Sequence, residues 1–513
     1  MLKIAVKSSS GLVTGDPKYS HAALAKKNGL PEPEESLRGF SPDGKIFLDR
    51  KQALEWIKKY EPDIYEKAKS LAPAEGIHSD NYAEAKGIKQ RVEQSKVDLS
   101  NKTCIVFDRG GLYTYVAQRL GKEFGKVGYY IPDAEAYPES QKAQIGKGLS
   151  GIERLNDEQY YQWIKKSDLI VFPDCYDGAY QNYLVNEGHC VFGSGLSEKM
   201  EIDKIFFLET LEKLGLPVAF TKLVKGIPEL TDYLTGKKDK WIKGLYRGDF
   251  ETKKYTGARQ FKNWLENYLI PKLGTKAKDI EILIQNKIES VAECGYDGFR
   301  VDGECTSNCL VGYEIKDKGL VAKVFEQPPE IIKSVNDSLT PIYKKLGYRG
   351  HYSNEIRVTE KGKAYAIDET CRTPSPPGEL MSLIYENYPE VIWKVAHGEM
   401  PIPKAKAQYG AEIILTSDFY EKHQICVEFP ESVSDNVMLK NHTKRDGAYY
   451  CIPNGNGSFF GAVAATGSTV KEATTKCLEI AEQIVCDDME YSKKVFDDAS
   501  DPVKAGERFG IKY

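Results

Sequence analysis

Short apolar runs alternate with amphipathic segments along residues 102–195. The apolar runs predict buried strands at residues 102–108, 126–132, 168–174 and 189–195. The segments between them predict a loop and helix at residues 109–124 and helices at residues 156–167 and 178–188. Because this alternation of strands and helices is typical of a parallel sheet with helices on its faces, we expect an α/β domain here.

Residues 196–490 follow a different pattern. The first part predicts a helix at 201–217, strands at 219–224 and 240–246 with a helix between them, a polar segment at 247–257 and another helix. Short polar turns then separate strands at 279–288, 297–304, 309–315, 352–360 and 364–370, which indicates an antiparallel series. The last strands, at 411–417, 449–454 and 459–466, precede a helix at 469–485.

The first 95 residues differ from the rest of the chain. A short strand-like start and a Gly/Ser/Pro-rich stretch lead to an Asp-Gly turn at residues 43–44, and Asp49 then opens an amphipathic helix. These features indicate a small appended module, whose function the sequence does not reveal. The charged segment 81–102 predicts a helix and a connector to the next domain.

A chain of 513 residues is too long for one ordinary core, so we expect several domains. The predicted fold class is a multidomain combination of α/β and α+β parts. The expected domains are an appended module (1–95), a parallel-sheet domain (96–195), a segment of mixed helix and strand (196–275), an antiparallel core (276–400), a C-terminal α+β domain (401–490) and a tail (491–513).

Composition narrows the class of protein. Hydrophobic residues make up 41% and charged residues 28% of the chain, which is ordinary usage for soluble domains. A net charge of -4 gives no electrostatic reason to expect nucleic acid as a stable partner or a membrane surface. No segment approaches the run of about 20 apolar residues that spans a bilayer, and the start lacks the apolar run of a signal peptide.

The eleven cysteines are scattered without Cys-x-x-Cys pairs. This usage fits a reducing compartment better than a disulfide scaffold, and it provides no cluster of zinc ligands. We therefore expect a cytoplasmic, soluble protein.

Candidate chemistry begins at residues 364–379, AYAIDETCRTPSPPGE. Asp368, Glu369 and Arg372 lie at the end of an apolar strand, and the prolines that follow stop it. A salt-bridged strand end is one interpretation; a Mg²⁺ site is the other, because Mg²⁺ prefers carboxylate oxygens. Glu355 lies on the preceding predicted strand, and a hairpin centred on residues 360–362 would bring Glu355 and Asp368 together.

Other charged residues precede this hairpin. Lys204 on a helix and Lys243 at the end of a strand are separated by a segment long enough to form a lid. The two glycines after Asp108, Gly110 and Gly111, would present backbone N–H groups to an anion at a helix start, although such pairs are usually just tight turns. Asp174 ends another strand at the carboxyl edge of the predicted sheet, where open α/β sheets bind ligands.

In this order the motifs resemble those of ATP-grasp enzymes, most closely the phosphoribosylamine-glycine ligase family, over about residues 100–490. The run LIVFPD, a helix and then HCVFGSGLSEKMEIDK is similar to that family's strand, helix and Phe-Gly segment, with Glu201 and Lys204 at its Glu and Lys positions. The most specific match is the C-terminal strand and helix, GSFFGAVAATGSTVKEATTKCLEIAEQI. The resemblance implies an ATP-grasp fold, with a lid at residues 196–275.

The resemblance also implies roles for individual residues. Lys204 and Lys243 would bind the phosphates of ATP, and Glu201 would join them in the nucleotide site. Gln285 would stand in place of the hinge Glu that reads adenine, and Glu293 would bind the ribose hydroxyls.

The metal and phosphoryl roles fall on the hairpin and its end. Glu355, Asp368 and Thr370 would hold one or two Mg²⁺ (or Mn²⁺) ions, with Glu369 as an alternative ligand if the strand register shifts by one residue. Arg372 would stabilise the transferring phosphoryl group. Asp108, Gly110, Gly111, Asp174 and Asp297 would contact the substrates.

Two segments depart from the family's pattern. The lid segment LYRGDFETKKYTG contains little glycine, so Arg247, Lys253 or Lys254 would cover the phosphates in place of a glycine-rich loop, if these residues do more than face solvent. The segment RTPSPPGE stands where the family has Arg followed by Gly-Asp-Pro-Glu, near the acceptor substrate. The acceptor substrate can therefore differ from that of the family.

The activity implied by the resemblance is ATP-dependent ligation of a carboxylate, such as glycine or another amino acid, to an amine through an acyl phosphate, as in purine biosynthesis. Positioning and charge neutralisation would supply most of the rate. The chemistry needs no Ser or Cys nucleophile, so His351 and Cys371 are interpreted as packed residues or as residues that support the site residues, and not as catalysts. Two alternatives remain open: a ligase with another acceptor (a modified nucleotide, nucleobase or peptide), and a non-catalytic nucleotide-binding scaffold.

Overall fold

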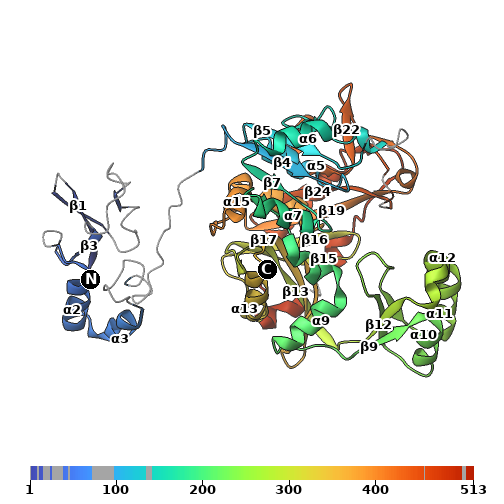
Figure 1. The fold of residues 1–513 in the computed structure, drawn as a ribbon, viewed down its shortest axis with the longest axis horizontal. Helices are drawn as coiled ribbons and strands as arrows, with labels where there is room; N and C mark the ends of the chain where they lie inside the picture. The colour runs from blue at the N-terminus through green and yellow to red at the C-terminus, as the bar shows by residue number, and fades with distance from the viewer. Residues whose placement is uncertain are drawn as a thin grey trace. The chain divides into compact units, whose positions relative to one another are not determined.

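The structure is a computed structural model of the whole chain. It describes residues 2–8, 11–15, 24–25, 38–43, 47–71, 82, 97–134, 141–453, 455, 457–498 and 504–512. The chain divides into two compact units, Met1–Lys96 and Val97–Tyr513 (Figure 1).

The first unit contains a three-stranded sheet with the order β2-β1-β3 and two helices. Its elements are β1 (Lys3–Ser8), β2 (Gly11–Gly15), β3 (Arg38–Ser41), α2 (Arg50–Tyr60) and α3 (Pro62–Leu71). The prediction that Asp49 opens a helix is confirmed, because its side chain accepts a hydrogen bond from the backbone N–H of Gln52 and completes a capping box. Most of the helix and connector predicted at 81–102 lies outside the described residues.

The second unit begins with the parallel sheet that the sequence predicts. Its strands have the order β6-β5-β4-β7-β8, and every pair is parallel. The elements are β4 (Thr103–Phe107), α5 (Thr114–Leu120), β5 (Lys126–Tyr130), β6 (Glu153–Leu155), α6 (Asp157–Ile164), β7 (Leu169–Val171), α7 (Gly178–Asn186) and β8 (Val191–Phe192). The edge strand β6 escapes prediction because two of its three residues are charged.

A lid lobe follows, defined here as residues 221–286, with a sheet of order β11-β10-β12-β9 (Figure 1). Two short helices lead to it, α8 (Lys199–Ile202) and α9 (Lys204–Lys213). The lobe comprises β9 (Thr221–Lys225), α10 (Gly226–Leu234), β10 (Lys240–Gly244), β11 (Lys253–Tyr255), α11 (Ala258–Trp264), α12 (Ile270–Leu273) and β12 (Glu281–Asn286). One face of this sheet packs on the helices through residues such as Val224, Ile242 and Ile282.

The largest sheet has the order β18-β17-β13-β15-β16-β19-β24-β21, with β14 and β26 paired at its margins. Its strands are β13 (Ser290–Val301), β14 (Glu304–Cys305), β15 (Cys309–Ile315), β16 (Gly319–Phe325), β17 (Arg349–Thr359), β18 (Ala364–Thr370), β19 (Tyr409–Ser417), β21 (Val437–Leu439), β24 (Phe459–Gly467) and β26 (Met489–Glu490). Because β19 pairs with β16, strands from the predicted C-terminal segment continue the antiparallel core.

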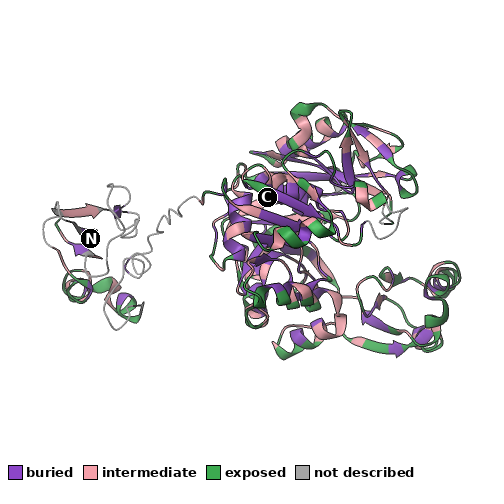
Figure 2. Ribbon diagram, turned by 45° about the horizontal axis from the view of Figure 1, so that its top comes forward, coloured by how far each residue is buried: buried purple, intermediate pink, exposed green. Residues whose placement is uncertain are grey.

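Helices and a small sheet complete this unit. The helices are α13 (Glu330–Lys345), α14 (Gly378–Ile384), α15 (Tyr388–Ala396), α16 (Val470–Ala481) and α17 (Val495–Asp498). The small sheet, of order β22-β23-β20-β25, contains β20 (Ile425–Glu428), β22 (His442–Arg445), β23 (Ala448–Cys451) and β25 (Val485–Cys486). Figure 2 shows buried residues concentrated along the central strands and exposed residues on the outer surfaces of the helices.

The prediction for strand β13 differs from the structure. The sequence predicts a strand at 297–304, whereas β13 starts at Ser290 and ends at Val301. Glu293 and Asp297 interrupt the apolar pattern of this strand, and both line a cavity. In the half of the strand that was not predicted, Glu293 breaks the apolar pattern because it lines the cavity instead of packing in a core.

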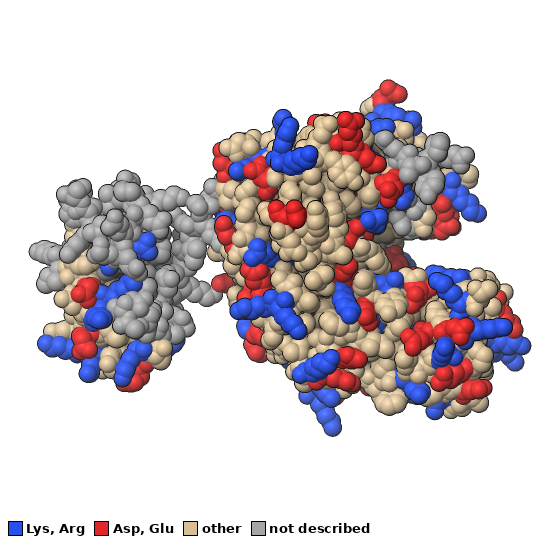
Figure 3. All heavy atoms as spheres, in the orientation of Figure 1, with Lys and Arg blue, Asp and Glu red and all other residues tan. Residues whose placement is uncertain are grey.

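The surface carries both signs of charge. Figure 3 shows Lys and Arg interspersed with Asp and Glu over one face of the molecule. Among the described helices, none has the length and apolar character needed to cross a bilayer.

Candidate active site

The hairpin formed by β17 and β18 carries the two acids that the sequence singled out. Hydrogen bonds between Thr359 and the Gly362–Lys363 turn close it, and Glu355 lies directly opposite Asp368. The prediction that the hairpin brings these two acids together is therefore confirmed. Their role as metal ligands stays a prediction.

An irregularity in the strand pairing determines which acid faces Glu355. From the turn, the pairs Val358 with Ala364 and Ile356 with Ala366 would continue to Glu355 with Ile367, but the register shifts by one residue at this point. Such a β-bulge places two residues of one strand opposite one residue of the other. Asp368 and Thr370 consequently line the same cavity as Glu355.

Glu369, the alternative metal ligand, has a different environment. Its carboxylate accepts a hydrogen bond of 2.5 Å from the hydroxyl of Tyr343, and only 1% of Glu369 is exposed. Burial raises the pKa of Glu369 to about 7. Glu369 is thus buried and does not line the acidic cavity that contains Glu355.

Lys204 contacts Asp368 directly. Asp203 caps the first turn of α9 through the backbone N–H of Phe206, and this cap places Lys204 at the start of the helix. The Lys204 ammonium donates a hydrogen bond to Asp368 Oδ1. Burial would raise the pKa of Asp368, but the attraction of Lys204 and Lys243 outweighs this effect and holds the pKa below its usual value.

Arg372 is held by acids from two other segments. Its Nε donates to Glu201 Oε1 at 2.9 Å and lies 3.7 Å from Asp174 Oδ1. Glu201 also accepts a hydrogen bond from the backbone N–H of Cys371 at 2.8 Å. The structure therefore shows Glu201 and Asp174 in contact with the arginine; their predicted contacts with nucleotide and substrate are untested.

Two adjoining cavities surround these residues. The cationic cavity, of about 300 Å³, is lined by Lys204, Lys243, Arg247, Lys272, Arg372 and the acids Glu201, Glu251, Asp368 and Glu369, among others. The acidic cavity, of about 230 Å³, is lined by Glu293, Asp297, Glu314, Glu355, Asp368 and Arg372, among others. Asp368, Thr370 and Arg372 line both cavities.

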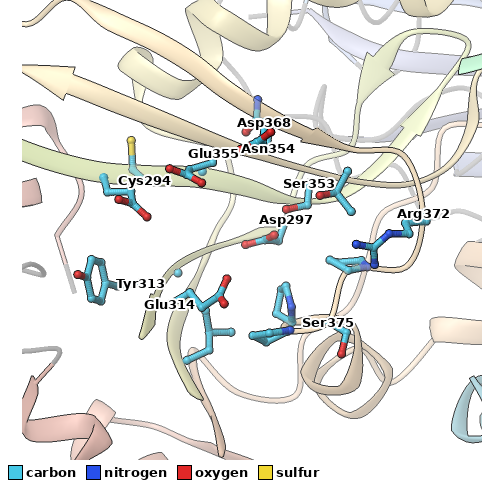
Figure 4. A pocket seen from close by; sticks show the side chains of 18 residues that line it. Cys294, Asp297, Tyr313, Glu314, Ser353, Asn354, Glu355, Asp368, Arg372 and Ser375 are labelled. Atoms are coloured by element: carbon cyan, nitrogen blue, oxygen red, sulfur yellow. The ribbon is translucent and has the colours of Figure 1, made fainter. Parts of the chain in front are cut away.

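Figure 4 shows the acidic cavity, with the carboxylates of Asp297, Glu314 and Glu355 directed into it from three strands. Burial raises the pKa of Asp297 to about 7, and a hydrogen bond with Ser353 opposes the rise. Glu314 as a residue is exposed, but desolvation of its carboxyl group in the cavity and the neighbouring carboxylates, Asp297 first among them, raise its pKa to about 7. Several acids in one cavity favour a cationic occupant.

Arg357 connects two of the predicted site residues and was missed by sequence reasoning. Its Nε donates to Glu355 Oε1 at 3.0 Å, and its Nη2 lies 3.3 Å from Glu293 Oε2. Burial raises the pKa of Glu355 to about 7, with the charges of Asp368 and Glu293 adding to the rise. The signal in the sequence was the spacing of Glu355 and Arg357. Residues two positions apart on a strand have their side chains on the same face of the sheet.

Lys243 and Gln285 share one face of the lid sheet. In the pairing of β10 with β12, Lys243 lies opposite Leu283 and Trp241 opposite Gln285, so all four side chains belong to one face. Gln285 donates a hydrogen bond to Thr221 Oγ1 at 3.2 Å and lines neither cavity. Its predicted contact with adenine is untested.

The loop after β4 is occupied by internal hydrogen bonds. Asp108 accepts from the backbone N–H groups of Leu112 and Tyr113 and from the hydroxyl of Tyr129. The carbonyl groups of Gly110 and Gly111 accept from Asn441. Asp108, Gly110 and Gly111 line neither cavity, and their predicted contacts with substrate stay untested.

His351 and Cys371 are packed, as the sequence analysis expects. The imidazole of His351 has hydrogen-bond partners on both nitrogens, Thr373 and Tyr388, and burial lowers its pKa to about 3. Cys371 is fully buried, and burial raises the pKa of its thiol well above the usual value. Neither residue lines the cationic or the acidic cavity.

Whether a magnesium ion fits this site depends on which oxygen atoms the side chains provide. Among the residues that the structure describes, no group of three or more His, Cys, Asp or Glu side chains is arranged to hold a metal. Mg²⁺ is commonly bound through one or two carboxylates together with substrate phosphates, rather than by a cage of protein ligands. Glu355 and Asp368, with the Thr370 hydroxyl nearby, are compatible with that mode.

Comparison with known proteins tests the fold. No sequence model of a known protein family matches the chain, and no curated protein matches it. Phosphoribosylamine-glycine ligase from Thermotoga maritima is similar in structure, with a TM-score of 0.58 and 17% identity over 76% of this chain and 99% of that chain. Biotin carboxylase from Campylobacter jejuni has a TM-score of 0.55 and 14% identity over 77% and 98%.

A third structure was solved with nucleotide. The biotin carboxylase domain of 2-oxoglutarate carboxylase from Hydrogenobacter thermophilus, in complex with MgADP, ADP and bicarbonate, has a TM-score of 0.54 and 12% identity over 80% of this chain and 99% of that chain. The chain has the ATP-grasp fold. In ATP-grasp terms, the parallel sheet precedes the lid lobe, and the large antiparallel sheet carries the hairpin acids. The predicted fold class is thereby confirmed.

Proposed function

We propose that this ATP-grasp protein is an ATP- and Mg²⁺-dependent ligase that joins a carboxylate to an amine through an acyl phosphate and releases ADP. The observation that supports it best is the junction of the cationic and acidic cavities at Asp368, Thr370 and Arg372. One cavity suits a polyphosphate and the other an amine, so their junction is a suitable place for phosphoryl transfer and the attack that follows.

Residues of the cationic cavity bind the nucleotide in this proposal. Lys204 and Lys243 contact phosphate oxygens, and Arg372 neutralises charge on the phosphoryl group as it moves to the carboxylate. The two nucleoside contacts of the proposal lie outside this cavity, since Glu293 lines the acidic cavity and Gln285 lines neither. Held by Glu201, Arg372 needs little rearrangement when charge develops, which is the property that makes an electrostatic site effective.

Glu355, Asp368 and Thr370 hold the magnesium ion. When bound, Mg²⁺ supplies charge neutralisation on the phosphates. In the described structure Lys204 contacts Asp368 and Arg357 contacts Glu355. These two cations neutralise part of the negative charge of the two acids.

The acidic cavity receives the amine. A primary amine enters as an ammonium ion, for which Asp297 and Glu314 are complementary partners. The carboxylate substrate, glycine or another amino acid, lies near Arg372 at the junction. The Pro-rich segment that follows Arg372 lines this cavity, so it contributes to the choice of acceptor.

Incubation with ATP, Mg²⁺, glycine and a panel of amines, including phosphoribosylamine, tests the proposal. ADP release is expected only when carboxylate and amine are both present, and the mass of the product identifies the acceptor. Release of AMP would contradict the acyl phosphate route. Tight nucleotide binding without turnover on any pair would favour a nucleotide-binding scaffold.

Two variants complete the experiment. Asp368→Asn is expected to lower turnover by about 100-fold or more while ATP still binds. The matched control, Asp317→Asn, lies in the exposed turn between β15 and β16 at φ 59°, a conformation that Asn tolerates. Equal turnover in both variants would refute the role of Asp368.

A further inference from the structure

The lid loop between β10 and β11 is fixed beside Lys204. The backbone N–H of Lys204 donates to Leu245 O at 3.0 Å, and that of Arg247 donates to Ile202 O at 3.1 Å. An isolated antiparallel bridge joins Asp203 and Tyr246 between these bonds. Arg247 therefore has a backbone position set by the α8–α9 junction, although it belongs to the lid.

The side chain of Arg247 shares its acidic partners with Arg372. Its Nη1 lies 3.3 Å from Glu201 Oε1 and 3.6 Å from Asp174 Oδ1, and it donates to Cys175 Sγ at 2.8 Å. Arg372 contacts the same Glu201 and Asp174 oxygens. Two carboxylates thus hold two guanidinium groups close together.

Both guanidinium groups keep donors available. Nε and Nη2 of Arg247 form no hydrogen bond within the described part of the chain, and neither does Nη2 of Arg372. Both arginines line the cationic cavity, next to Lys204 and Lys243. Guanidinium donors are well suited to phosphoryl oxygens because they form paired, charge-assisted hydrogen bonds.

The other two lid cations suggested by the sequence lie elsewhere. Lys253 and Lys254 are on β11, and neither lines the cationic cavity. Lys254 is exposed. Of the three candidates, only Arg247 lies where a triphosphate would be bound.

We propose that Arg247 is a second catalytic arginine, which binds the phosphoryl group together with Arg372 while it is transferred and takes the place of a glycine-rich phosphate loop. This inference rests on the proposed function. The transferring phosphoryl group carries its charge on three equatorial oxygens, and cations placed around them lower the barrier. Glu201 and Asp174 keep the two like-charged guanidiniums together before the nucleotide arrives.

The test compares binding of Mg·ADP alone with binding of Mg·ADP plus aluminium fluoride, which imitates the phosphoryl group in transfer. The wild-type protein is expected to bind the fluoride complex more tightly than ADP. In Arg247→Gln the affinity for ADP should change by about 2-fold or less, while the gain from fluoride falls by about 100-fold, the loss typical of one such donor. Arg247→Lys keeps the charge without the paired donors and should fall between the two.

Two further lid variants serve as comparisons. Lys262→Gln, on the exposed side of α11, should behave as the wild type. The inference would be overturned if Lys254→Gln, and not Arg247→Gln, lost the gain in affinity that aluminium fluoride gives. It would also be overturned if Arg247→Gln kept the full gain. An equal loss of ADP and fluoride affinity in Arg247→Gln would also overturn it, because that result indicates a structural role. A wild-type protein that does not bind Mg·ADP would overturn the proposed function itself.

Discussion

Replacing Glu201 by Gln removes the charge that holds the two arginines of the cationic cavity. Only 6% of the Glu201 side chain is exposed, and its carboxylate accepts hydrogen bonds from Arg372 Nε and from the backbone N–H of Cys371. Glutamine has the same size but one acceptor oxygen. If that oxygen stays with Arg372, the amide NH₂ group faces the N–H of Cys371, donor against donor.

The expected cost follows from these contacts. Loss of a hydrogen bond to a charged group costs about 1.5–3 kcal/mol, and an unpaired buried charge raises that to about 3–5 kcal/mol. Asp174 still lies near Arg372 and Arg247, so part of the charge compensation remains. We expect Glu201→Gln to lower the free energy of unfolding by about 3 kcal/mol.

Urea unfolding of the full chain, followed by near-ultraviolet circular dichroism, measures this cost. The matched control is Glu209→Gln on α9, where an exposed pair with Lys213 at 3.2 Å should contribute less than about 0.5 kcal/mol. A double-mutant cycle with Arg372→Gln should give a coupling energy above about 1 kcal/mol. Equal costs for the Glu201 and Glu209 variants, or a coupling near zero, would refute the reasoning.

Three further outcomes are expected. Calorimetry should show Asp368→Asn binding ATP with reduced dependence on Mg²⁺, and an unchanged Mg²⁺ dependence would contradict a ligand role. Burial raises the pKa of Asp297 from 3.8 to about 7, so the native state binds this proton more tightly than the unfolded chain, and raising the pH from about 4 to about 7 should destabilise the protein. Asp297→Asn should reduce this loss of unfolding free energy by up to about 4 kcal/mol, because a tenfold change in proton affinity corresponds to about 1.36 kcal/mol. Identical pH profiles of denaturation for the variant and the wild type would refute the prediction. Gly111→Ala should lower the free energy of unfolding by about 2–3 kcal/mol, because φ is +71° and a Cβ would lie 2.7 Å from Asn441 Nδ2; a midpoint equal to that of the wild type would refute this.

Local signals predicted most of the secondary structure. The strand pattern and the prolines in residues 364–379 predicted where β18 begins and ends, and Asp49 predicted where α2 begins. The parallel sheet followed from apolar runs that are buried on both faces. These features depend on neighbours in the sequence, so they are legible without a structure.

Contacts between distant segments were not legible in the same way. Arg247 meets Asp174 and Glu201 only because the lid loop pairs with the α8–α9 junction. From the sequence alone, Arg247 is therefore one of three candidate lid cations, and Glu201 has a predicted role at the nucleotide but no predicted link to Arg372. A charged residue gives no signal in hydrophobic periodicity that identifies its partner.

The hairpin shows how one backbone irregularity decides which acid faces Glu355. A regular ladder continued from the turn would put Ile367 opposite Glu355, and Glu369 rather than Asp368 would then share the face of Glu355. The bulge reverses this assignment, so that Asp368 reaches Lys204 while Glu369 stays buried with Tyr343. The alternation in the sequence shows which residues of a strand share a face, but a bulge can change which of the two sets faces the neighbouring strand's Glu355. The two alternative metal ligands left open by the sequence are therefore the two outcomes of one register choice, and the pairing of β17 with β18 makes that choice.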